Sequence, residues 1–143
     1  NFDDEDLFNY TYLVKNKVTY YRSERIVENS DMVDIRKFLF CVKKDISFYT
    51  SERLAKKFSY TQLKKFFLLV GMGTSVYCSE KITENFNDIE ILKYKYLIEK
   101  KVTPYFAELT VMNLRRRGEF NPNMYSYCNN LNPSEIIEFL NIN

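Results

Sequence analysis

A charge-free segment, Phe66 to Cys78 (FFLLVGMGTSVYC), restricts the fold of this chain more than any other part of its sequence. It lies between charged flanks and holds two of the three glycines, Gly71 and Gly73. A helix of this length rises about 20 Å, roughly two thirds of the hydrocarbon thickness of a bilayer, and is too short to span one. We therefore expect a single buried helix, beginning near Thr61, at the centre of a soluble core.

The two glycines inside this segment need a physical reason, because each costs about 1 kcal/mol of helix propensity relative to alanine. Close packing of a neighbouring helix in the core would offset that cost. A helix whose exposed side forms the floor of a binding groove would offset it equally well. Both explanations are open from the sequence alone.

Size and composition limit the classes of function. With 143 residues, the chain fits one domain over residues 1–143 that buries about two thirds of its unfolded surface. The net charge of +2 does not by itself indicate a nucleic-acid partner. The absence of histidine excludes His-based triads and imidazole metal ligands. We expect a binding protein and not an enzyme, with no cofactor, no metal and no nucleic acid.

The three cysteines, Cys41, Cys78 and Cys128, are far apart and surrounded by apolar or aromatic residues. Their odd number and spacing predict neither a disulfide framework nor a metal site. We expect reduced thiols in a cytosolic protein. Any membrane anchor would lie in a tail beyond Asn143.

Helical periodicity dominates the rest of the chain. From Asp4 to about Arg25, apolar residues recur every three or four positions, and the acidic start suits a helix N-terminus. A hairpin with strands Tyr10–Val14 and Val18–Arg22 competes with this helix.

Further helices are expected over Ser30–Ile46 with Ser30 or Asp31 as its cap, through Phe58 with Ser51 as its cap, and from Asp88. Pro104 can sit in the first turn of a further helix or kink a continuous one, and that segment ends at Gly118. A last helix is expected from Pro133 to Leu140. Arg115-Arg116-Arg117 would form a solvated helix end. Neither repeats nor linkers are evident. The sequence thus predicts an all-α fold, a compact bundle of six to seven helices around a central hydrophobic helix.

Four stretches, taken in order, resemble the Bcl-2 family of apoptosis regulators. Leu13-Val14 through Val18-Thr19-Tyr20-Tyr21 resembles the family's opening helix, and Phe66–Cys78 resembles its buried central helix. Val102-Thr103-Pro104-Tyr105-Phe106-Ala107-Glu108 is similar to the end of the second central helix, and Gly118-Glu119-Phe120 stands where a glycine-aromatic turn occurs. The matches spread over Leu13 to Phe120.

The chain also departs from that family. Tyr60-Thr61-Gln62-Leu63 stands where cellular members have Asn-Trp-Gly-Arg, so Lys64 or Lys65 would have to supply the missing cation. An internal death-helix pattern is best matched by Ile26-x-x-x-Ser30-Asp31-x-Val33 and more loosely by Phe40-x-x-x-Lys44-Asp45.

The resemblance implies a viral protein, most similar to poxvirus members, that captures an amphipathic death-promoting (BH3) helix of host pro-apoptotic proteins in a surface groove. Its setting would be the host cytoplasm, or the mitochondrial outer membrane for a longer protein. The implied groove residues are Leu54, Phe58, Leu63, Lys64, Lys65, Phe66, Phe67 and Val70.

Two other functions are compatible with the sequence. One keeps the Bcl-2-like fold but fills the groove, so that another face binds host adaptors or kinases of innate immune signalling (the NF-kappa-B pathway), with a homodimer as the form in which such proteins often act. The other is a helical nucleic-acid or replication-complex factor that uses paired lysines and Arg115–Arg117, which would show strong salt dependence.

Overall fold

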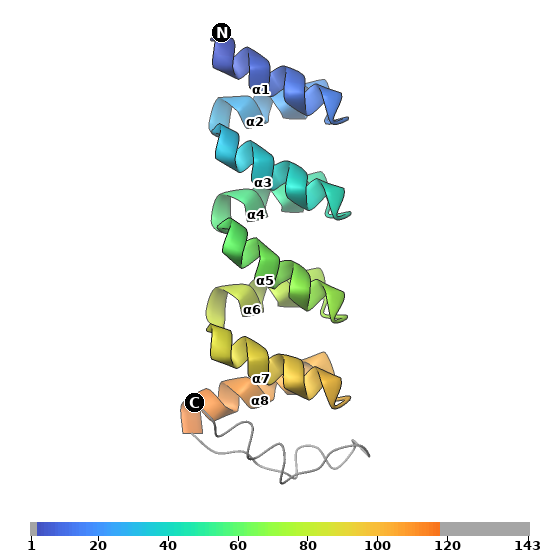
Figure 1. Ribbon diagram of the computed structural model, residues 1–143, viewed down its shortest axis with the longest axis vertical. Helices are drawn as coiled ribbons and strands as arrows, with labels where there is room; N and C mark the ends of the chain where they lie inside the picture. The colour runs from blue at the N-terminus through green and yellow to red at the C-terminus, as the bar shows by residue number, and fades with distance from the viewer. Residues whose placement is uncertain (1–2, 118–143) are drawn as a thin grey trace. The chain divides into compact units, whose positions relative to one another are not determined.

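The computed structural model describes residues 3–117, and this part of the chain is all α-helical, with eight helices and no strand (Figure 1). The predicted all-α class is confirmed. The helices are α1 (Asp4–Lys15), α2 (Tyr20–Asn29), α3 (Met32–Lys43), α4 (Phe48–Lys57), α5 (Tyr60–Gly71), α6 (Val76–Asn85), α7 (Asp88–Glu99) and α8 (Pro104–Arg117). They exceed the expected six to seven because two expected long helices are each divided.

The segment Phe66–Cys78 is not one helix, so that prediction is wrong. α5 ends at Gly71, and Gly73 adopts a φ of 93°, which a glycine takes without the steric cost that other residues incur. Ser75 then caps α6, its side chain accepting a hydrogen bond from the Cys78 N–H. The glycines thus end one helix and allow the next to begin, and they need no groove or crowded core.

The first expected helix, Asp4 to Arg25, is divided in the same way. Lys17 adopts a φ of 68° after α1, and the Thr19 side chain caps α2 by accepting from the Arg22 N–H. One continuous helix is therefore the wrong prediction for this region. The competing strand hairpin over residues 10–22 is wrong as well, because Tyr10–Val14 lies in α1, Tyr20–Arg22 lies in α2, and Val18 and Thr19 between the helices form no strand.

The prediction that the chain lacks repeats is also wrong. The odd-numbered helices begin every 28 residues, at Asp4, Met32, Tyr60 and Asp88. The turn inside each helix pair holds one residue at positive φ, again every 28 residues: Lys17, Asp45, Gly73 and Lys101. A Ser or Thr follows two residues later, immediately before the second helix: Thr19, Ser47, Ser75 and Thr103. The described chain therefore consists of four helix-pair repeats.

The remaining boundaries follow from the caps. Asp31, one of the two expected residues, caps α3, whereas α4 is capped by Ser47 and not by Ser51. Ser51 is instead fully buried inside α4. α7 begins at Asp88 as expected, with a capping box between Asn87 and Glu90, and α8 begins at Pro104 and ends at Arg117. The helix expected over Pro133–Leu140 lies outside the described residues.

The chain divides into two compact units, Asn1–Leu63 and Lys64–Asn143. That one domain spans residues 1–143 stays a prediction. In the first unit, α1 packs on α2 and α3, and α3 packs on α4. Its core comprises Leu13, Val18, Ile26, Val27, Ile35, Phe38, Leu39 and Ala55.

In the second unit, α7 packs on α8. Its core draws on the end of α5, on α6 and on both later helices: Leu69, Ile82, Phe86, Ile91, Tyr94, Leu97, Val102, Ala107, Val111 and Leu114. The buried Tyr94 hydroxyl lies 2.6 Å from the Thr74 hydroxyl, so the only polar atom of this core side chain forms a hydrogen bond.

A small residue recurs in the first turn of each second helix. Ser23, Ser51, Ser79 and Ala107 occupy the same repeat position and are completely buried. Each serine hydroxyl donates to a carbonyl five residues earlier, as Ser51 does to Ile46 at 3.2 Å. A larger side chain here would meet a closely packed interior, which is costly.

Candidate interaction surface

Aligned at the 28-residue period, the four repeats (residues 3–30, 31–58, 59–86 and 87–114) share an identical residue at two positions. One is a tyrosine in the first turn of each second helix: Tyr21, Tyr49, Tyr77 and Tyr105. The other is a glutamate three residues later: Glu24, Glu52, Glu80 and Glu108. Residues three apart on a helix lie on the same face, so each tyrosine and its glutamate are neighbours.

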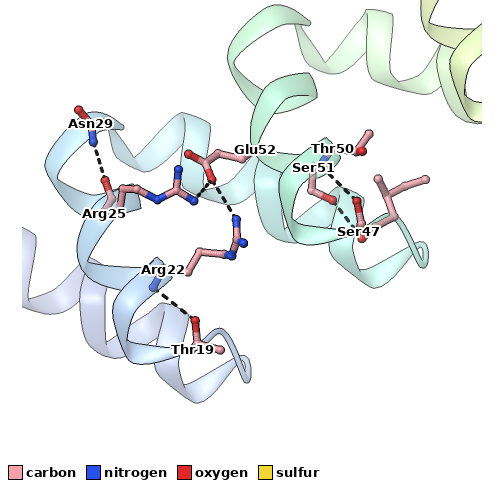
Figure 2. A network of polar contacts seen from close by, with 9 residues as sticks. Thr19, Arg22, Arg25, Asn29, Ser47, Thr50, Ser51 and Glu52 are labelled. Carbon is pink, nitrogen blue, oxygen red and sulfur yellow. Dashed lines mark hydrogen bonds and ion pairs between the residues drawn. The ribbon is translucent and has the colours of Figure 1, made fainter.

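The glutamate has a structural role in the first unit. Figure 2 shows Arg22 and Arg25 of α2 directed at Glu52 of α4. Arg25 Nη2 donates to Glu52 Oε1 at 2.8 Å, and Arg22 Nη1 lies 3.4 Å from the same oxygen. The Glu52 side chain is only 18% exposed, so these charge-assisted hydrogen bonds connect the second helices of successive repeats.

The second unit repeats this contact. Lys81 of α6 lies at the repeat position of Arg25, and its Nζ is 2.9 Å from Glu108 of α8. The hydrogen bond with Glu108 raises the pKa of Lys81 above its ordinary value. An ion pair between second helices therefore accounts for the glutamate at both Glu52 and Glu108.

The tyrosines, in contrast, are not explained by burial. Their exposed fractions are 79% for Tyr21, 70% for Tyr49, 74% for Tyr77 and 68% for Tyr105. Neighbouring repeat positions have diverged widely, and the residue just before each tyrosine is Tyr20, Phe48, Val76 or Pro104. A large aromatic side chain that is kept at an exposed position indicates use in recognition, since Tyr is enriched at interfaces.

A cation accompanies two of these tyrosines. The Arg53 guanidinium lies 5.7 Å from the Tyr49 ring centroid, and Lys81 Nζ lies 5.9 Å from that of Tyr77. At exposed sites such contacts contribute about 0.5–1 kcal/mol. The surface thus presents an aromatic ring next to a positive charge in each unit.

Each unit has a shallow hollow beside this arrangement. In the first unit a hollow of about 160 Å³ is lined by Arg25, Tyr49, Glu52, Arg53 and Lys56. In the second, one of about 280 Å³ is lined by Lys81, Asn85, Phe86, Glu108, Met112 and Arg115. Both adjoin the ion pair between second helices, and Arg25, Glu52 and Lys56 of the first hollow occupy the repeat positions of Lys81, Glu108 and Met112 in the second. None of the recurring tyrosines lines the second hollow.

Half of the predicted groove residues lie in the interior. Leu54, Phe58, Leu63 and Phe66 are each at most 2% exposed. Leu54 belongs to α4, and Phe58 follows that helix as its C-cap. In the described conformation these four side chains pack inside the protein, and the groove that they were expected to line stays a prediction.

The other four predicted groove residues all lie on α5. Lys64 is exposed, whereas Lys65, Phe67 and Val70 are half-buried. Lys65 Nζ lies 2.5 Å from Asp88 Oδ1 at the start of α7, and the Phe67 ring packs edge-on against Phe66. Lys65, one of the two expected cations for a bound helix, therefore already has an internal carboxylate partner.

The stretches that suggested a Bcl-2-like protein coincide with turns of the repeat. Leu13–Tyr21, Phe66–Cys78 and Val102–Glu108 each run across or out of the turn that separates the helices of one pair. The pattern from Ile26 to Val33 crosses from α2 into α3, with Asp31 as a helix cap. The one from Phe40 to Asp45 leaves α3 for the following turn. The resemblance of these stretches to the Bcl-2 family stays a prediction.

Arg115, one of the cations of the nucleic-acid hypothesis, makes two hydrogen bonds with Glu90 and one with the Asn85 carbonyl, all at 2.6 Å. Cys41 is buried and Cys78 half-buried, both as free thiols, while Cys128 lies outside the described residues. Within residues 3–117 no cluster of three or more carboxylates and thiols could hold a metal ion.

The tyrosine positions were missed because helical periodicity alone assigns the aromatic residues to a core. The signal that could have found them is the recurrence of Tyr-x-x-Glu at a fixed interval of 28 residues. That interval differs from the roughly 33 or 34 residues of the common helix-pair repeats.

The fold and this surface define the class of protein: an all-α protein made of helix-pair repeats. Searches of protein-family models, of curated proteins and of solved structures found no match to the chain. None of the helices in the described range is both long and apolar enough to cross a membrane.

Proposed function

We propose that this protein is an interaction module that binds other proteins through the tyrosine-bearing side of its second helices. The observation that supports this is the retention of an exposed tyrosine at the same position of all four repeats. Tyrosine supplies a large contact area at low conformational-entropy cost and is enriched among binding hot spots. Helix-repeat proteins commonly bind their partners through surfaces that the repeat presents.

A peptide display library tests this proposal, and α2 offers a matched control. Binders are selected on the purified chain and then titrated against the variant Tyr21→Ser/Tyr49→Ser/Tyr77→Ser/Tyr105→Ser. Tyr20→Ser is the control, because Tyr20 is 70% exposed next to Tyr21 but does not recur in the other repeats. We expect the quadruple variant to lose at least about tenfold in affinity and the control to bind normally, since hot-spot tyrosines contribute about 2 kcal/mol or more.

Two results would sink the proposal. One is selected peptides that bind the quadruple variant and the Tyr20→Ser control equally well. The other is a library that yields no peptide enriched over an unrelated helical protein.

A narrower hypothesis comes from the Bcl-2 resemblance, in which the partner is an amphipathic death-promoting helix. It belongs to the same class of function and differs in the residues used. A panel of synthetic death-promoting helices separates the two: binding that Lys65→Glu weakens and the tyrosine variant leaves unchanged would favour the Bcl-2-like function over ours.

A further inference from the structure

In the first unit, the second helix pair packs on the first through two apolar side chains and one charge. Ile35 and Phe38 of α3 belong to a core cluster that they share with apolar residues of α1 and α2. Glu52 of α4 accepts a hydrogen bond from Arg25 of α2 at 2.8 Å (Figure 2). The following pair thus contributes an aliphatic, an aromatic and a glutamate side chain to the contact between repeats.

The second unit uses the same three residue types at the same repeat positions. Ile91 and Tyr94 of α7 share a core cluster with residues from the end of α5 and from α6. Glu108 of α8 lies 2.9 Å from Lys81 of α6. The contact between successive helix pairs is therefore made in the same way in both units.

The first repeat keeps these residue types but leaves them accessible to solvent. Leu7 is 56% exposed, whereas the equivalent Ile35 and Ile91 are 0% and 5% exposed. Tyr10 is half-buried and Glu24 is exposed. Among residues 3–117 no helix pair precedes α1, so no second helix brings a cation to Glu24 as α2 and α6 do to their partners.

Leu7, Tyr10 and Glu24 together form the upstream face of the first repeat. Repeat proteins normally carry polar residues on a terminal face that remains in water. This face instead retains the aliphatic, aromatic and glutamate residues of a contact between repeats. Its chemistry therefore fits another helix pair that presents apolar side chains and one cation.

The last described helix pair of a second copy would not supply that cation. The repeat position of Arg25 and Lys81 holds Leu109 in α8. Head-to-tail stacking of two copies would thus place an aliphatic side chain where Glu24 requires a positive charge. Charge complementarity favours a different helix pair.

We propose that the upstream face docks a helix pair of the same 28-residue type from a partner protein, whose second helix places a Lys or Arg against Glu24. Apolar side chains of that pair cover Leu7 and Tyr10, as the first repeat covers Ile35 and Phe38. Two arguments select this occupant: continuity with the contact between successive repeats and the charge of Glu24.

This docking leaves the recurring tyrosine accessible. Tyr49 and Tyr105 are 70% and 68% exposed although the neighbouring Glu52 and Glu108 are paired with the preceding helix pair. Tyr21 can therefore remain exposed when Glu24 is paired. The inference does not depend on the tyrosine surface and goes beyond it.

A fusion protein tests the inference. A second copy of residues 3–30 is joined through a flexible Gly-Ser linker to the N-terminus of the whole chain, because its Arg25 and its apolar residues already make this contact with the following repeat. Its helices of 12 and 10 residues are at or below the length of about 12–15 residues under which isolated helices are marginal in water. The added copy should therefore become helical only when it docks.

Far-UV circular dichroism measures the docking. We expect the fusion to gain about a quarter of the helical signal of the eight described helices, since one pair is added to four. Slower hydrogen exchange of the original α1 amides than in the chain alone should accompany this gain.

A pair of matched variants assigns the docking to the upstream face. Leu7→Lys/Glu24→Lys in the original repeat should remove most of the gain, because it places two cations where the added pair presents apolar groups and Arg25. Phe8→Lys/Glu28→Lys is the control, with the same substitutions on the same helices at exposed positions whose residue type varies among the repeats. Each variant is also measured without the added copy, so that any loss of its own helices is subtracted.

Three outcomes would overturn the inference. The first is a wild-type fusion that gains no helical signal, and the second is an equal gain in both variants. The third comes from sedimentation of the chain without the added copy: a dimer that Leu7→Lys/Glu24→Lys dissociates and the control leaves intact would assign the face to a second copy. All these proteins keep the four recurring tyrosines, so none of these results counts against the tyrosine-dependent function proposed above.

Discussion

The two described cysteines lie in different environments, although the sequence predicted a reduced thiol in apolar or aromatic surroundings for both. Cys41 is fully buried, and burial raises the pKa of its thiol to about 11, an effect that the charge of Lys37 only partly opposes. Cys78 is half-buried near the start of α6. Because the thiolate is the reactive form, Cys41 should be nearly inert at neutral pH.

Alkylation measures this difference. In a Cys128→Ser variant treated with iodoacetamide at about pH 8, Cys78 should react at least about tenfold faster than Cys41. In concentrated urea the two rates should become similar, because the unfolded thiols share an ordinary pKa. Fast alkylation of native Cys41 would show that this side chain is not held in the core.

The Glu90–Arg115 pair predicts a pH-dependent contribution to stability. Arg115 donates two hydrogen bonds to the Glu90 carboxylate, and these lower the pKa of Glu90 below its ordinary value of 4.5. A carboxyl group with a depressed folded pKa stabilises the protein above its unfolded pKa, and that contribution is lost as the pH falls through the folded pKa.

Urea unfolding of the wild type and Arg115→Gln tests the pair. Since Arg115 is 45% exposed, solvent screening limits the expected loss to about 0.5–1 kcal/mol at neutral pH. The difference between the two proteins should shrink as the pH falls below the ordinary glutamate pKa of 4.5 and through the lowered pKa of Glu90. A difference that stays constant over this range would mean that packing of the Arg115 stem, and not its charge, stabilises the fold.

At the scale of the helix pair, the turn after each first helix stores backbone strain. Lys17, Asp45 and Lys101 adopt φ values of 68°, 66° and 70°, where only the third repeat has a glycine, Gly73. A left-handed conformation costs a non-glycine residue roughly 1–2 kcal/mol. The positive φ nevertheless recurs in all four repeats, so the rest of the turn fixes it.

This strain predicts that Lys17→Gly stabilises the protein, by about 0.5–1 kcal/mol after the entropy that glycine gains in the unfolded chain is subtracted. Arg36→Gly, on an exposed position in the middle of α3, should destabilise it by about 1 kcal/mol. Thermal unfolding of both variants gives the comparison. A lower melting temperature for Lys17→Gly would show that its backbone is not strained.

The turns between helices show which helix boundaries could be predicted from the sequence and which could not. The start of α7 at Asp88 was predicted because its signal is local, whereas a helix start at Pro104 was one of two alternatives that the sequence left open. The breaks at Lys17 and Gly73 were missed, since a lysine gives no warning of a positive φ and apolar residues on both sides mimic one continuous helix. Burial of Phe58 and Phe66 likewise depends on packing that periodicity does not reveal.

For the whole described chain, the 28-residue repeat was not predicted because equivalent positions share the chemical type of their residue but rarely its identity. The cap position, for example, holds Asp3, Asp31, Ser59 and Asn87. The candidate surface was not predicted for a related reason. The recurring tyrosine can be recognised as exposed only when the buried positions of the same helices are known. The all-α class needed no such information, since helical periodicity and composition determine it.

The proposed role of the tyrosines makes a final prediction about the stability of the molecule. If the four exposed rings serve recognition, their joint replacement by serine should change stability little, since exposed substitutions usually fall within about 0.5 kcal/mol each. The cation contacts of Tyr49 and Tyr77 add at most about 1 kcal/mol apiece.

Phe38→Ala supplies the contrast, because Phe38 is 1% exposed in the core of the first unit and its truncation should cost about 3–5 kcal/mol. Circular dichroism and urea unfolding of both variants give the comparison. We expect the quadruple variant to keep its helicity and a midpoint near that of the wild type, and Phe38→Ala to unfold at much lower urea. Comparable losses of stability in the two proteins would show that the tyrosines have a structural role, because removing a ring that is needed for folding destabilises the protein.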